Sequence, residues 1–227
     1  MPDLHFITIL GLGFLLGARH ALDTDHIVAV STMLARAPDL RRSGLVGLCW
    51  GVGHTAVLLA IGLVVLALQI TIPESVAQAC EAGVGVMLIV LGGALALTLY
   101  REHWHLHTHA HDGERHLHLH SHSLSTDHSH RHGWSGLLRP VLVGMVHGLA
   151  GSAALMLVVL STVRTPGEGV VYILVFGLGS ILGMVALGIL ISVPFIFSFS
   201  QGRSVQVAVQ GLASVASIGF GLALLFR

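Results

Sequence analysis

The feature that most constrains this chain is a series of long apolar segments, each reaching the roughly 20 residues that a helix needs to cross a bilayer. Only 10% of the residues are charged and the mean hydropathy is +0.84, whereas soluble domains carry about 25% charged residues. The sequence therefore predicts an all-α, polytopic transmembrane helix bundle, multi-pass in the cell (inner) membrane. The about six expected spans cover residues 4–34, 44–70, 79–100, 138–162, 170–199 and 205–226.

Charge excludes one large class of partner. Lys plus Arg and Asp plus Glu both number 11, and no basic patch with interleaved aromatic residues is present. The sequence therefore indicates no nucleic-acid partner.

The two cysteines, Cys49 and Cys80, both lie in apolar segments and form no C-x-x-C motif. A disulfide framework is not indicated.

The arginines predict the orientation in the membrane through the positive-inside rule. In a six-span arrangement only Arg164 and Arg227 fall on one side. The opposite side, which we expect to be cytoplasmic, carries Arg36, Arg41, Arg42, Arg101, Arg115, Arg131, Arg139 and Arg203. Both chain termini are then expected outside.

A histidine-rich segment at residues 101–134 separates the third and fourth spans, and holds 12 of the 17 histidines. It has no apolar face with which to pack a core, so we expect a largely disordered cytoplasmic loop. Alternating H-x-H positions could chelate a divalent ion and so buffer or sense metal at the inner mouth. A polar linker without a metal role is the alternative.

The segments on the two sides of this loop resemble each other in order. Because three spans are an odd number, such a duplication predicts two inverted three-helix repeats, residues 1–100 and 135–227, joined by the loop 101–134. His20 would then correspond to His147, and His54 to Ser180. The matches are "GARHALD" (17–23) with "GMVHGLA" (144–150), "WGVGHTA" (50–56) with "FGLGSIL" (176–182), and "GGALAL" (92–97) with "GFGLAL" (219–224).

The first span contains five ionisable residues within eight positions: Arg19, His20, Asp23, Asp25 and His26. A charged group in hydrocarbon costs at least about 2.5–3.5 kcal/mol at a helix centre, so such groups persist where they face a polar pathway and have partners. Histidine and aspartate together suit a divalent transition metal, and Arg19 could pair with an aspartate when the site is empty. Packing or capping roles for these side chains are the alternative.

Spacing limits how these groups can act together. At about 100° per residue, His20 and Asp23 are near neighbours, whereas Asp25 and His26 point about 120–140° away from His20. Either the helix breaks locally or the two pairs serve different partners, and we favour a break. The candidate metal ligands are His20, Asp23, Asp25, His26, His54 and His147, and we expect neither a resident cofactor nor an enzyme.

Two motifs resemble the nickel/cobalt transporter family. "RHALDTDH" is similar to the family signature R-H-A-x-D-A-D-H, and "GHT" at 53–55 is similar to its second histidine motif. The family's later motif, L-G-x-D-T-A-T-E, has no clear match, and "MVHGLAGSAAL" stands near its place, as in the shorter, urease-accessory-type branch. The resemblance implies Ni²⁺ or Co²⁺ as substrate and implies metal roles for the five residues in these motifs. His147 rests on the repeat.

Two functions follow as hypotheses. The first is transmembrane transport of a divalent cation, Ni²⁺ or Co²⁺, through the intramembrane His/Asp site. The second is a membrane-bound metallochaperone or accessory protein that supplies nickel to a cytoplasmic metalloenzyme such as urease. Partners are then the metal ion, the lipid bilayer and, in the second case, that enzyme or a metallochaperone.

Overall fold

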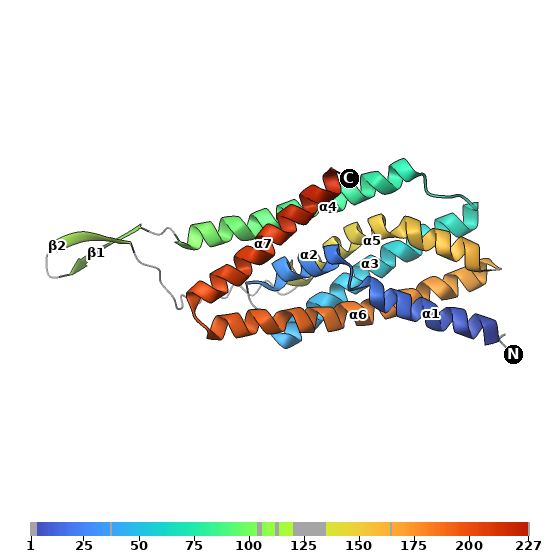
Figure 1. The fold of residues 1–227 in the computed structure, drawn as a ribbon, viewed down its shortest axis with the longest axis horizontal. Helices are drawn as coiled ribbons and strands as arrows, with labels where there is room; N and C mark the ends of the chain where they lie inside the picture. The colour runs from blue at the N-terminus through green and yellow to red at the C-terminus, as the bar shows by residue number, and fades with distance from the viewer. Residues whose placement is uncertain are drawn as a thin grey trace.

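The computed structural model describes residues 4–36, 38–103, 106–111, 114–119, 135–163 and 165–226. Its helices run side by side along one long axis, with a two-stranded hairpin at one end (Figure 1). The elements in chain order are α1 (Leu4–His20), α2 (Thr24–Leu34), α3 (Leu40–Leu68), α4 (Glu74–His103), β1 (Leu106–His111), β2 (Glu114–Leu119), α5 (Ser135–Thr162), α6 (Pro166–Ser200) and α7 (Arg203–Leu225).

Four of the described helices are long and apolar enough to cross a membrane by length and composition: α3, α4 through Arg101, α6 and α7. Two shorter apolar stretches, Ile7–His20 and Leu137–Gly151, belong to α1 and α5. The bundle is thus that of a multi-pass membrane protein, as predicted. The finer count of six spans stays a prediction.

The first predicted span is broken, as the spacing of its charged residues predicts. α1 ends at His20, and two tight turn bonds follow, from Leu22 N–H to the Arg19 carbonyl (2.8 Å) and from Asp23 N–H to the His20 carbonyl (3.1 Å). Asp23 is extended (φ −63°, ψ 148°) and is the N-cap residue of α2. Its side chain makes no capping hydrogen bond, and its negative charge suits the positive end of the helix dipole.

The helices pack mainly between the two halves of the chain. α1 lies against α6, α3 against α5 and α6, and α4 against α7. Glycines permit the close approach: a Cβ at Gly17 would overlap the Phe176 carbonyl oxygen, and a Cβ at Gly144 would overlap that of Trp50. Close backbone contact through small residues is the usual packing of membrane helices, where burial against lipid gives no driving force.

Part of the histidine-rich segment differs from the expected disorder. β1 and β2 form an antiparallel hairpin in which His107 pairs with His118 and His109 with His116. Alternating H-x-H has the period of two that defines a strand, so the pattern fits a hairpin. Figure 1 shows it beyond the end of the bundle. Positions 104–105, 112–113 and 120–134 lie outside the described residues.

Candidate metal centre

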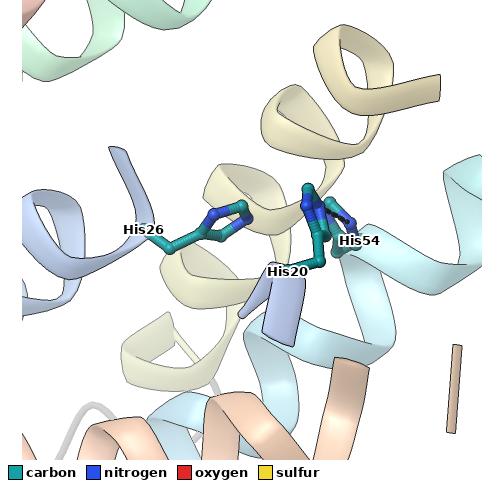
Figure 2. Close-up of side chains that lie close together, drawn as sticks. All are labelled: His20, His26 and His54. Carbon is teal, nitrogen blue, oxygen red and sulfur yellow. Dashed lines mark hydrogen bonds between the residues drawn. The ribbon is translucent and has the colours of Figure 1, made fainter. Parts of the chain in front are cut away.

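Four histidines from four helices meet inside the bundle. His20 ends α1, His26 lies in the first turn of α2, and His54 and His147 face them from α3 and α5. Ring centroids are 4.8 Å apart for His20 and His26, 5.1 Å for His20 and His54, 5.4 Å for His26 and His54, and 4.9 Å for His26 and His147. Figure 2 shows three of these rings turned toward one another.

The cluster divides into one accessible imidazole and three buried ones. His26, His54 and His147 are 1%, 0% and 2% exposed, whereas the His20 side chain is 21% exposed. His20 Nε2 lies 3.2 Å from His54 Nε2, a hydrogen bond that requires a proton on one of the two rings (Figure 2). Both ring nitrogens of His26, His54 Nδ1 and His147 Nε2 have no hydrogen-bond partner. Since buried polar atoms are nearly always partnered, these nitrogens indicate a ligand.

The two aspartates lie on either side of the helix break. Asp23 Oδ2 accepts from His20 Nδ1 at 2.8 Å, and its side chain is 54% exposed. Asp25 is 26% exposed and lies between two histidines, with its Oδ1 3.2 Å from His26 Nδ1 and its Oδ2 3.6 Å from His147 Nε2. Each carboxylate therefore lies beside an imidazole, and Asp25 is the more buried of the two.

Two groups of ligand atoms are close enough to share an ion: His20, His26 and His54 in one, Asp23, Asp25 and His26 in the other. Within each, the atoms lie within 4.8 Å of one another. Two nitrogens bound about 2.1 Å from one ion are at most about 4.2 Å apart, so a small inward movement completes either group. His26 belongs to both. The structure thus brings together all six predicted site residues, with His147 joined through Asp25 and His26.

Two aromatic residues that the sequence did not single out hold these rings. The Trp50 ring lies 5.7 Å from the His26 ring and 5.0 Å from the His147 ring. Phe176 lies 5.7 Å from His20. Groups around a metal site orient its ligands and control access of water. Trp50 stands four residues before His54, one helical turn away, which is the signal that could have found it.

A pocket of about 370 Å³ opens onto the accessible side of the cluster, and His20 and Asp23 form part of its wall. Arg19 and Glu81 also line it. Sequence reasoning missed Glu81, although a carboxylate in the apolar third span could have been noticed by the argument used for Asp23. In the described part of the chain Arg19 forms no ion pair with either aspartate, so its expected counter-ion role is not seen in this structure.

Two hydroxyls near the second histidine motif do not join the cluster. Thr55 Oγ1 donates to the Gly177 carbonyl of α6 at 3.3 Å, which is a helix-packing contact. Ser180, the expected counterpart of His54, is fully buried and has no hydrogen-bond partner for its Oγ. The second half of the chain therefore contributes one described imidazole, His147, to the centre.

Membrane-buried imidazoles and carboxylates gathered at a broken helix define a transport protein for a metal cation. Comparison with known proteins agrees: the chain belongs to the NicO family, described as high-affinity nickel-transport protein, whose family model matches residues 6–202. Over 224 residues it is 36% identical to the urease accessory protein UreH of Bacillus sp. (strain TB-90), covering 98% of this chain and 92% of that protein. No solved structure matches.

Family membership confirms the function class that the sequence predicted. The protein is a membrane transport protein of a nickel-transporting family rather than an enzyme, and its substrate is a divalent metal ion.

Proposed function

We propose that this protein moves Ni²⁺ or Co²⁺ across the cell (inner) membrane through the centre at the helix break. The observation that carries the proposal is the set of buried imidazole nitrogens that make no hydrogen bond in the described chain. Two of them, His26 Nδ1 and His147 Nε2, lie within ion-pair distance of Asp25. The ligands are His20, Asp23, Asp25, His26, His54 and His147.

The order of the ligands follows from their exposure. An ion entering from the pocket beside Arg19 and Glu81 first meets the accessible pair, His20 and Asp23. His54 and His26, both buried, come next, since their rings lie about 5 Å from that of His20. The two groups of ligand atoms share His26. As the ion moves inward it can pass from one group to the other while His26 stays bound, so it keeps protein ligands as it loses its hydration water.

The donor set favours a late first-row ion. Imidazole nitrogen suits nickel, cobalt, zinc and copper, whereas magnesium and calcium prefer sites made of oxygen. The aspartates offset the charge of the dication, which is why a cluster containing two carboxylates can persist in an apolar helix.

Two inverted three-helix repeats give this site its place at the centre, and matching contacts support them. Under the offsets of 126 and 127, the contact of Gly17 with Phe176 corresponds to that of Gly144 with Trp50. The contact of Gly53 with Val141 corresponds to that of Gly179 with Phe14. Transporters built in this way expose a midplane site to one side at a time by moving one repeat against the other.

The arginine-rich end of the bundle is the cytoplasmic end in this proposal. The membrane potential, negative inside, then favours inward movement of the dication by about 2.3 kcal/mol per charge for each 100 mV.

Flux into proteoliposomes tests the proposal. Purified protein of known orientation is supplied with radioactive Ni²⁺ or Co²⁺, and His20→Ala and Asp25→Ala are compared with Glu74→Gln, which changes an exposed carboxylate at the start of α4. We expect the two site variants to lose flux while still inserting, and the control to keep it. Full flux in both site variants would reject the site. Inhibition of this flux by added Zn²⁺ or Mn²⁺ measures the selectivity of the protein among divalent ions.

A second function is favoured by one observation, the name of the Bacillus relative, which calls it a urease accessory protein. In that case the histidine-rich segment hands metal to a cytoplasmic metalloenzyme such as urease, or to its metallochaperone. Deleting residues 103–132 separates the two. Transport that survives while maturation of the enzyme fails supports delivery, and maturation that is restored by excess metal alone supports transport as the sole role.

A further inference from the structure

A second pocket, of about 400 Å³, lies at the opposite end of the bundle from the entry side of the metal centre. Three arginines line it, and we call it the arginine pocket. Arg36 follows α2, Arg42 lies in the first turn of α3, and Arg139 lies in the first turns of α5. Three separate elements thus bring guanidinium groups to one cavity.

A smaller pocket of about 160 Å³ adjoins the arginine pocket, and the two share wall residues, among them Arg36 and Thr98. Arg203 at the start of α7 lines the smaller pocket. Gln210 fixes this wall, because its Nε2 donates to the Ala35 carbonyl at 2.7 Å and is buried. The neighbouring helices therefore hold the basic residues around two adjoining pockets.

Among the described residues that line the two pockets, none is acidic. The nearby carboxylate of Asp39 accepts the backbone N–H of Arg42 at 2.8 Å, which caps α3. The rest of the wall is apolar and includes Met33, Leu91 and Leu95. Several basic side chains beside apolar walls, at a membrane end of the bundle, suit an anion that also has an apolar part.

We infer that the arginine pocket binds the phosphate of an anionic phospholipid headgroup, with the lipid chains along the apolar wall. Guanidinium groups pair with phosphate oxygens through two parallel N–H bonds. Basic pockets between transmembrane helices on the cytoplasmic side are suited to anionic headgroups. A soluble phosphate would satisfy the arginines but would leave the apolar wall beside them uncovered.

The position of this pocket links it to the metal centre. Its walls include Val143, whose carbonyl lies 3.2 Å from His147 Nδ1, and Val46, one helical turn before Trp50. If the dication leaves toward this end, which rests on the proposed function, it passes three guanidinium groups. A bound phosphate would offset their charge, so the lipid would make the exit passable for a cation.

Lipid binding can be measured without any metal. The full chain in detergent is titrated with phosphatidylglycerol or phosphatidylcholine, and retained lipid is counted by native mass spectrometry. We expect one tightly held phosphatidylglycerol and no equivalent phosphatidylcholine. Arg42→Gln combined with Arg139→Gln should weaken its binding about 10-fold or more, because each basic residue near an anionic lipid contributes a several-fold effect. Arg41→Gln, an exposed neighbour outside the pocket, is the matched control.

Each other outcome has a defined meaning. Equal binding of the two lipids, or unchanged binding in the double variant, would overturn the inference. Displacement of the lipid by millimolar inorganic phosphate would reject the lipid as the occupant in favour of the free ion. Arg42→Lys combined with Arg139→Lys keeps the positive charge but cannot form the two parallel N–H bonds of a guanidinium group. We expect an intermediate loss of lipid binding in this variant, which provides a test even if the glutamine variant does not fold.

Flux is measured separately in vesicles with and without phosphatidylglycerol. If the metal proposal fails, the binding result still stands. If lipid binding fails while flux depends on the His/Asp centre, only the present inference is lost.

Discussion

Two of the helical segments that carry histidines into the centre, the α1–α2 segment and α5, differ in one respect. The first is broken between His20 and Thr24, and the break carries Asp23 and is followed by Asp25. The second, α5, runs unbroken through His147, whose Nδ1 lies 3.2 Å from the carbonyl four residues earlier. No acid accompanies His147 in "GMVHGLAGSAAL".

The two segments therefore contribute unequally to the centre. The broken segment aims two imidazoles and two carboxylates from both sides of a gap, so it supplies the charge and most of the ligands. The continuous segment supplies one imidazole and a close-packed wall. The backbone contacts are shared between the halves, but the chemistry is concentrated in one.

The largest effect should follow removal of His26, the residue common to both groups of ligand atoms. We expect His26→Ala to lower the initial rate of nickel uptake more than about 100-fold, because changing even an outer partner of a metal ligand typically costs 10–100-fold. Uptake at subsaturating metal in proteoliposomes measures it. A variant that keeps half of the wild-type rate would contradict the assignment.

His147→Ala should have a smaller effect, about 10-fold to 100-fold on the same rate. His147 reaches the centre through Asp25 at 3.6 Å and through the His26 ring, and it belongs to neither compact group of ligand atoms. A loss equal to that of His26→Ala would show that the continuous helix contributes as much as the broken one.

The shared backbone contacts predict matched losses of stability. Gly17→Ala and Gly144→Ala each place a Cβ against a carbonyl oxygen of α6 or α3, so each should lower the free energy of unfolding by about 1–3 kcal/mol. Gly11→Ala meets nothing within 4 Å and is the control. Thermal unfolding in detergent compares them. Unequal losses would count against the correspondence of the two halves.

The smallest effect should come from the entry pocket. Glu81→Gln removes a carboxylate that lines the pocket without joining either ligand group. Exposed charge pairs contribute about 0.2–1 kcal/mol, so the metal concentration at half-maximal uptake should rise by about five-fold at most, with the maximal rate unchanged. The effect should fade at high salt, and Glu74→Gln should show none.

The helix break was predictable because four ligand-type residues at positions 20, 23, 25 and 26 cannot face one point from one regular helix. The same residues predicted the metal centre, because charged groups in an apolar membrane segment are costly and usually mark a functional site. His54 was predicted as a ligand from a motif and His147 from the repeat, and the rings of both lie beside that of His26 in the structure.

Other features could not be predicted, for a physical reason. Lipid-facing and protein-facing sides of these helices are both apolar, so the sequence does not reveal which side of α3 or α6 is buried. Trp50 and Phe176 therefore went unnoticed beside the histidines. The hairpin was not predicted, because a segment with no apolar side gives no signal of packing.

The interlocking of the two halves has a consequence for how the protein is made. Since α1 packs on α6, α3 on α5 and α6, and α4 on α7, the helices that leave the ribosome first find few partners among themselves. The early segments must wait in the bilayer, with their acids and imidazoles uncovered, until the later ones are synthesised. We therefore expect the separately expressed N-terminal half to be degraded quickly and to be rescued by co-expression of the other half.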